Sequence, residues 1–185
     1  MLWFHCDSAT GAIVTGGMAP TAELAAAQGA NAPEGQQLVV VPDGTVSNMF
    51  SAKPNFTVLT TMLCQKIDAQ AGELRMRFIT DVPGQAQTYE RKEREARTWT
   101  AGDDAVHPEL YPFMIAEAQA RSIGVAEVRA QIMQQVDALT PIAARIEAQR
   151  VAAKAAITAA AALPGILAAA QIDWNAVVAS PAAAN

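Results

Sequence analysis

Few side chains of this sequence have the type and spacing that catalysis or metal binding needs. His5 and Cys6 are adjacent, and a cysteine beside a histidine can act as a nucleophile with its base. Neighbouring residues of a β-strand point to opposite faces, however, so we expect no contact between these two side chains. The second cysteine and the second histidine, Cys64 and His107, stand alone, and no Cys-x-x-Cys or His-x-x-x-His spacing supports a zinc site. The sequence therefore predicts unpaired thiols, no catalytic residue and no metal site.

Two further groups of polar residues suggest chemistry but have simpler explanations. Asp103 and Asp104 are a single acidic pair without the alternating oxygen ligands of a calcium loop, so we expect them to cap a helix. Residues 90–95 carry both acidic and basic side chains, a mixture of signs that is typical of a solvated helix face. The glycines match no phosphate-binding loop. We predict that the protein is not an enzyme and binds no cofactor.

The composition of the chain favours helices. Of the 185 residues, 51% are hydrophobic, yet only 5% are aromatic and 17% charged, and 41 are alanine. Alanine has the highest helix propensity but a small side chain, so we expect a thin core that partner subunits help to complete. The net charge of −5 disfavours a dedicated nucleic-acid binder. We expect neither a secretion signal nor a membrane-inserted segment.

Residues 1–58 are predicted to form a small β-rich region. Leu2–Cys6 and Ala12–Thr15 read as a hairpin around the turn 7–11, which Gly16 and Gly17 end. A second hairpin is expected from Leu38–Val41 and Val46–Phe50 around the Pro42–Thr45 turn. Between the two hairpins, Thr21–Gln28 has the composition of a weak helical turn.

Residues 59–121 are predicted to be helical. Apolar residues recur every three or four positions from Leu59 to Phe78, and a second helix is expected over Gln85–Trp99 after the Pro83-Gly84 turn. We expect these two helices to pack as a hairpin, with Arg75 and Arg77 free to pair with acidic residues of the second helix. A further helix is expected to begin at Pro108 and to tolerate Pro112 in its first turns.

Residues 122–163 are predicted to form one long helix, and residues 164–185 an Ala/Pro tail. Small and apolar residues follow a heptad frame from Ile132 to Ala160. The frame is interrupted by Arg150 and by Pro141, which is expected to kink or divide the helix. The fold class is thus mainly α with a small N-terminal β region. Two readings of the heptad stripe stay open: it packs against the chain's own shorter helices, or it forms a seam with another subunit.

Several segments resemble helical parts of tailed-bacteriophage tail proteins. They are Gln65–Thr80, the Pro83-Gly84-Gln85 turn, Tyr89–Ala96, Tyr111–Ala118 and Arg145–Lys154. The resemblance covers about residues 62–162. The similar sequences include those of tail fibre, tail-tip and tail fibre assembly proteins. The strand–turn–strand order from Trp3 to Val14 is similar, more loosely, to the start of many such sequences.

The resemblance implies a structural component of a phage tail, at the tail tip, baseplate or fibre attachment, located in the virion and made in the host cytoplasm. Its expected partners are other tail proteins and further copies of itself. A tail fibre assembly chaperone is the alternative, and a receptor-binding tip is a third reading. The residues expected at an interface are Ile132, Val136, Leu139, Ala143, Ile146 and Ile157 of the long helix, with Trp3 and Phe4 near the N-terminus.

Overall fold

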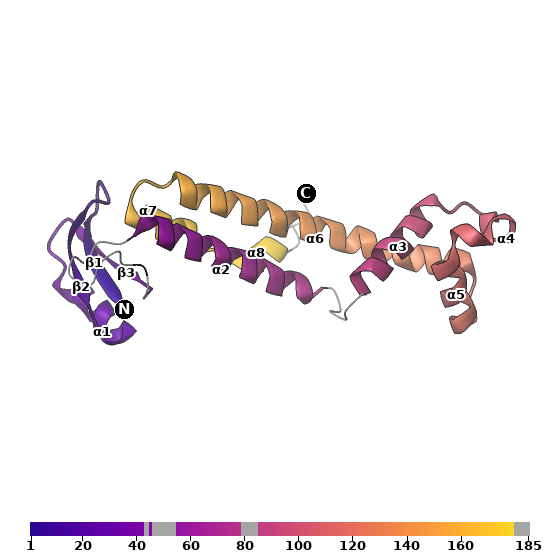
Figure 1. Cartoon of the computed structure of the whole chain (residues 1–185), viewed down its shortest axis with the longest axis horizontal. Helices are drawn as coiled ribbons and strands as arrows, with labels where there is room; N and C mark the ends of the chain where they lie inside the picture. The colour runs from indigo at the N-terminus through magenta and orange to yellow at the C-terminus, as the bar shows by residue number, and fades with distance from the viewer. Residues whose placement is uncertain (43–44, 46–54, 79–84, 180–185) are drawn as a thin grey trace, which may run out of the picture. The chain divides into compact units, whose positions relative to one another are not determined.

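A computed structural model describes residues 1–42, 45, 55–78 and 85–179 of the chain, and it confirms the mainly α class with a small β region (Figure 1). The described residues form two compact units. The first unit joins residues 1–71 to residues 148–174, and the second unit contains residues 72–147 and the residues after 174.

A three-stranded antiparallel sheet begins the first unit. Its strands are β1 (Leu2–Asp7), β2 (Ile13–Met18) and β3 (Gln36–Val41), in the order β2-β1-β3. The predicted N-terminal hairpin is therefore confirmed. The first strand of the second predicted hairpin is present as β3 and pairs with β1, whereas Val46–Phe50 lies outside the described residues.

The prediction that Gly16 and Gly17 end the hairpin is wrong, because both lie inside β2. The rings of β1 explain this placement. Gly16 is paired with Phe4, and a Cβ on Gly16 would lie 2.4 Å from the Phe4 ring; a Cβ on Gly17 would lie 2.8 Å from the Trp3 ring. The two glycines thus provide the space into which the aromatic side chains of the neighbouring strand fold.

Alternate residues of β1 form the centre of the first core. Leu2, Phe4 and Cys6 point to one face of the sheet, which packs against α2 (Phe56–Met76), the end of α6 (Val125–Ala159) and α7 (Leu163–Ala169). The buried members of this core are Leu2, Phe4, Cys6, Val39, Val41, Leu59, Leu63, Ile67, Ala153, Ile157, Leu163 and Ile166. Residues from both ends of the sequence therefore build a single core.

The opposite face of the sheet lies beside the short helix α1 (Ala22–Ala27), which confirms the predicted helical turn, and the 3-10 helix η1 (Gln28–Asn31). The Thr21 hydroxyl caps α1 by accepting a hydrogen bond from the Leu24 amide. The imidazole of His5 contacts the Gln28 carbonyl at 3.1 Å. Because β1 separates their side chains, Cys6 lies in the core and His5 does not face it.

Helices α2 and α6 run antiparallel, which revises the expected partner of α2. Asp68 of α2 accepts hydrogen bonds from Arg150 at 2.7 Å and from Lys154 at 2.6 Å, both on α6. Further along α2, Arg75 pairs with Glu147 and not with the second predicted helix. The periodicity identified the buried residues of α2 from Leu59 to Leu74, whereas Phe78 lies beyond the helix and is exposed. Periodicity carries no information on which helix covers the buried face.

The second unit contains α3 (Gln85–Thr98), α4 (Asp103–Val106), the 3-10 helix η2 (Pro108–Leu110), α5 (Pro112–Arg121) and the first part of α6. Its core consists of Ala96, Tyr111, Met114, Ala118 and Val128. Ala96 of α3 therefore packs on α5 and α6, and not on α2 as the sequence suggested.

Proline positions differ from the predictions in two places. Pro112 rather than Pro108 occupies the first turn of α5, and Pro108 starts η2. Pro164 lies in the first turn of α7 instead of ending α6. Pro141 lies inside α6, which continues past it. Part of the predicted tail is the short helix α8 (Trp174–Val178). None of the described helices is both long enough and apolar enough to span a membrane.

Candidate interaction surface

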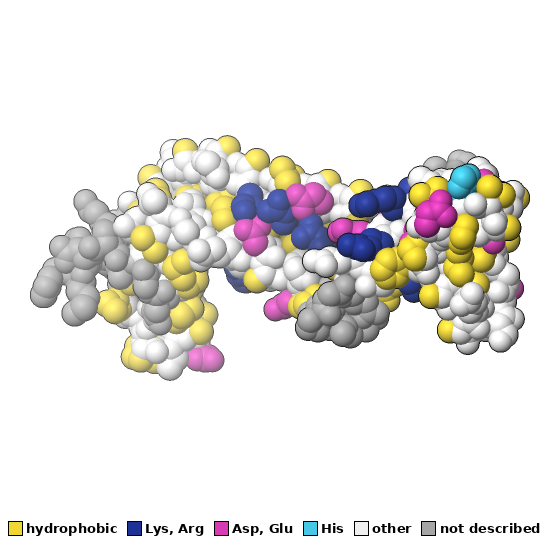
Figure 2. Space-filling model, turned by 45° about the vertical axis from the view of Figure 1, so that its right-hand side comes forward, with side chains coloured by type: hydrophobic (Ala, Val, Ile, Leu, Met, Phe, Trp, Pro, Cys, Tyr) yellow, Lys and Arg dark blue, Asp and Glu magenta, His cyan; other side chains and the backbone are white. Residues whose placement is uncertain are grey.

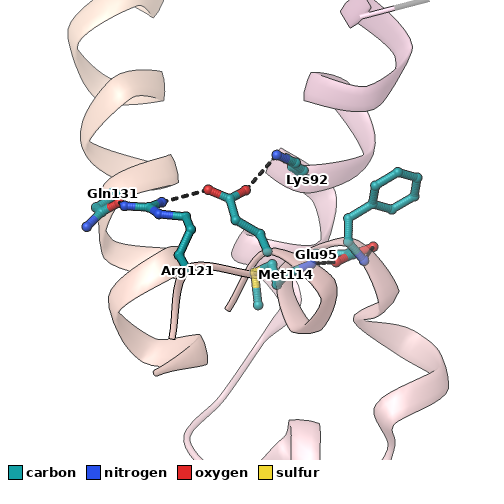
Figure 3. Close-up of polar contacts among 7 residues, drawn as sticks. Lys92, Glu95, Met114, Arg121 and Gln131 are labelled. Carbon is teal, nitrogen blue, oxygen red and sulfur yellow. Dashed lines mark hydrogen bonds and ion pairs between the residues drawn. The ribbon is translucent and has the colours of Figure 1, made fainter. Parts of the chain in front are cut away.

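A buried carboxylate fixes the start of α5. Glu95 of α3, only 7% exposed, accepts hydrogen bonds from the backbone amides of Phe113 at 3.2 Å and Met114 at 2.9 Å (Figure 3). These amides belong to the first turn of α5, where no helical carbonyl is available to them. The negative charge also suits the positive end of the helix dipole. Glu95 therefore links α3 to α5 at a defined position.

A second polar network connects α3, α5 and α6. Glu117 of α5 pairs with Lys92 of α3 at 2.6 Å and with Arg121 at 2.7 Å, and Arg121 also donates to Gln131 of α6 at 2.7 Å (Figure 3). The hydrogen bond from Lys92, supported by Arg121, lowers the pKa of Glu117. The contacts hold the first turns of α6 against the α3–α5 pair.

Two arginines of α6 bind the C-terminal ends of other helices. Arg129 donates to the Ala96 carbonyl in the last turn of α3 at 2.9 Å, and its guanidinium lies 5.8 Å from the centre of the Trp99 ring. Arg145 donates to the carbonyls of Val177 at 3.0 Å and Val178 at 3.3 Å at the end of α8. A cation at the negative end of a helix dipole is favourable, so each arginine anchors a short helix to α6.

No residue of α6 from Arg129 to Arg145 is buried. The same helix has buried apolar residues on either side of this stretch, at Val128 and at Ile146. Ile132, Val136 and Leu139 are half-buried and Ala143 is exposed, and all four follow the heptad frame. We call these four residues the α6 stripe. Ile132 packs against the second core, and Val136 and Leu139 keep part of their side-chain surface exposed to solvent.

The charge on this stretch is low. Between the two anchoring arginines, Asp137 is the one charged residue, and it is exposed. Elsewhere along the helices, acidic and basic side chains lie next to one another on the face that Figure 2 presents, in agreement with the ion pairs of Asp68 and Arg75. The α6 stripe is therefore a sequence of apolar side chains on a stretch of helix with little charge.

The remaining predicted interface residues already make contacts within the chain. Phe4 and Ile157 are buried in the first core, and Ile146 is buried as well. Trp3 is half-buried on the other face of the sheet, with its ring 5.2 Å from that of His5. Ile146 and Ile157 of the heptad frame are therefore buried within the chain itself. Trp3 belongs to the first unit, and the α6 stripe belongs to the second unit.

The residues first considered for chemistry have structural roles. Asp103 accepts a hydrogen bond from the Thr100 hydroxyl at 2.7 Å and another from the Tyr111 hydroxyl, and these bonds lower its pKa. Asp103 and Asp104 were expected to cap a helix. Gly102, with φ 92°, occupies the N-cap position of α4 instead, and the two aspartates lie in the first turn of that helix. Burial raises the pKa of the Cys6 thiol, which makes it a poor nucleophile.

Among residues 1–42, 45, 55–78 and 85–179, no group of three or more His, Cys, Asp or Glu side chains is arranged to hold a metal ion. The sequence interpretation missed Glu95, Arg129 and Arg145. Their spacing gives no signal, because each binds backbone groups far away in the sequence.

Comparison of the chain with protein-family models, with curated proteins and with solved structures found no match. The α6 stripe and its two anchors therefore rest on this structure alone.

Proposed function

We propose that the protein is a non-enzymatic structural component of a larger assembly, held there by protein–protein contacts through the α6 stripe. The observation that carries this proposal is the stretch of α6 from Arg129 to Arg145, which has heptad-spaced apolar residues and no buried residue. A stripe of this kind, low in charge and anchored at both ends, can accept a helix from another subunit.

The kind of assembly is proposed from the resemblance of residues 62–162 to tail proteins of tailed bacteriophages. We infer a position at the tail tip, baseplate or fibre attachment, with other tail proteins and further copies of this chain as partners. The ordered network around Glu95 and Glu117 supports a structural role, because it fixes the helices that present α6.

A charge placed on the α6 stripe tests the proposed contact. We expect the double change Val136→Asp and Leu139→Asp to abolish association, because two carboxylates cannot be buried in an apolar seam without partners. The measurement is the mass of the full chain in solution, by light scattering after gel filtration, together with pull-down from a phage lysate.

The matched control is Gln134→Asp with Ala138→Asp, two exposed residues of the same helix that lie away from the stripe. This variant carries the same added charge and is expected to associate normally. Circular dichroism of both variants verifies that α6 stays helical. If both variants associate as strongly as the parent chain does, the α6 stripe is not the contact surface.

Purified particles test the location. A structural component is expected in virions at a fixed copy number, by quantitative mass spectrometry. Presence in the lysate with absence from particles would favour the assembly chaperone instead.

A further inference from the structure

A shallow hollow of about 300 Å³ lies in the second unit, between α3 and the segment formed by η2 and the start of α5. We call it the α3–α5 hollow. Its lining combines charged side chains, most of them from α3, with apolar side chains of η2 and α5, and its outer side is open to solvent. No residue of the α6 stripe lines it, so it is a separate surface from the contact proposed above.

Two arginines of α3 supply positive charge to the α3–α5 hollow. Arg91 and Arg94 are exposed and lie three residues apart, which makes their side chains neighbours on one helix face. The Arg91 guanidinium lies over the Phe113 ring, 6.0 Å from its centre, and a guanidinium held over a ring keeps the N–H groups at its edge available to an acceptor. In the described part of the chain, neither arginine forms an ion pair with a carboxylate.

The two carboxylates of the lining already have other partners. Both oxygens of Glu95 accept backbone hydrogen bonds at the start of α5 (Figure 3). The Glu109 carboxylate lies 3.4 Å from Nδ1 of His107. These acids leave the arginine N–H groups without an acceptor but offset part of the arginine charge. The hollow therefore suits a singly charged carboxylate better than a doubly charged phosphate.

The apolar part of the lining gives the occupant a second requirement. Leu110 of η2 is 57% exposed, and it lines the hollow together with Pro112 and Phe113 of α5. An aliphatic side chain that covers this surface removes apolar area from water. A wholly uncharged segment would bury both guanidinium groups without giving them an acceptor, which costs free energy. An acidic group next to an aliphatic one satisfies both parts of the lining.

We propose that the α3–α5 hollow binds an extended segment of a partner protein in which an acidic residue is flanked by aliphatic residues. Arg91 and Arg94 bind the acidic side chain through charge-assisted hydrogen bonds, and Leu110 and Pro112 contact the aliphatic side chain beside it. The open outer side allows the segment to cross the hollow, so the carboxylate is that of a side chain within the segment.

Short capped peptides test the chemistry of the site on the full chain. The probe is acetyl-Leu-Glu-Leu-amide, and the measurement is the NMR shift of the Phe113 ring signals as the peptide is added. The shifts are expected to be much smaller with acetyl-Leu-Gln-Leu-amide, which lacks the charge, and with acetyl-Gly-Glu-Gly-amide, which lacks the aliphatic side chains. Phe113 signals that do not move with the glutamate probe, or that move equally with inorganic phosphate, would overturn the proposal.

A pair of matched variants separates charge in the hollow from charge elsewhere. Arg94→Gln is expected to weaken binding of the glutamate probe by about tenfold, the size of one charge-assisted hydrogen bond. Arg77→Gln removes the same charge from an exposed position outside the hollow and is expected to leave the affinity unchanged. Equal affinities of the two variants for the probe would overturn the proposal, because the effect would then be one of net charge or no effect at all.

Leu110→Ser tests the apolar part of the lining. This variant is expected to reduce the shifts caused by the glutamate probe to those caused by acetyl-Gly-Glu-Gly-amide. Leu110, Arg94 and Arg77 are all exposed, so the fold is retained in each variant, and circular dichroism verifies this. Unchanged binding of the probe by Leu110→Ser would contradict the aliphatic contact.

These outcomes are separate from those of the α6 experiment. A chain with Val136→Asp and Leu139→Asp is expected to bind the glutamate probe as the parent chain does, and Arg94→Gln is expected to keep the α6 contact. Failure of one proposal therefore leaves the other standing.

Discussion

At the scale of single residues, a few side chains do most to define the structure, and they do so by shape or by hydrogen bonds to the backbone. Phe4 and Trp3 occupy space that only glycine leaves open in β2. Glu95, Arg129 and Arg145 each bind backbone groups at a helix end. These contacts join segments that are distant in the sequence, which is why residue spacing did not reveal them.

The glycines of the chain allow a paired prediction. Gly16→Ala is expected to destabilise the protein by about 1–3 kcal/mol, because the added Cβ must displace the buried Phe4 ring. Gly72 is an interior residue of α2 with nothing within 4 Å of an added Cβ, so Gly72→Ala is expected to stabilise by about 0.5–1 kcal/mol. Urea unfolding of the two variants and the parent chain measures both changes. A Gly16→Ala chain as stable as the parent chain, or more stable, would contradict the close packing between Phe4 and Gly16.

At the scale of helices and strands, the sequence predicted the elements better than their partners. Alternation and turn residues identified the β1–β2 hairpin, and the apolar period identified α2, α3 and α6 with small errors at their ends. The pairing of α2 with α6 could not be predicted, because an amphipathic pattern defines a face and not the helix that covers it. The prolines were misplaced for a related reason: Pro108 and Pro112 both suit a first turn, and packing of Tyr111 and Met114 decides between them.

The ion pairs between α2 and α6 give a prediction about pH. Hydrogen bonds from Lys154 and Arg150 hold the pKa of Asp68 below its ordinary value. Because the pKa of Asp68 is lower in the folded state, its carboxylate stabilises the fold at pH values above the pKa of an aspartate in the unfolded chain, about 3.9. This contribution disappears as the pH falls through the folded-state pKa of Asp68. Asp68→Asn should therefore lower the melting temperature at pH 7, and the difference from the parent chain should shrink below about pH 4. A difference that is constant from pH 7 to pH 2.5 would show that these charges do not contribute.

At the scale of the whole molecule, the first unit is discontinuous in sequence. Residues 1–71 form a compact body only together with residues 148–174, and α6 supplies residues to both units. Phe4 and Ile157 lie in the same buried cluster although most of the chain separates them. The core of the first unit therefore needs the buried residues of α6 as well as those of α2.

Removal of one side chain from α6 tests this dependence. Ile157→Ala is expected to cost about 2–5 kcal/mol, because Ile157 is fully buried and the sheet can close the cavity only in part. In hydrogen exchange, the amides of β1 should lose protection, while those of α5, whose core does not include Ile157, should change little. Equal loss of protection in β1 and α5 would show that the two units unfold as one.

The discontinuity of the first unit also determines the order in which the protein can fold during its synthesis. The ribosome makes β1, β2, β3 and α2 early, but the other residues that cover the apolar face of the sheet, from Ala153 to Ile166, emerge only after the whole of residues 72–147. The second unit therefore has its core residues available first. Throughout that interval α2 alone can cover Leu2, Phe4 and Val41, so part of the apolar face of the nascent sheet stays exposed, and exposed apolar surface of this kind promotes aggregation.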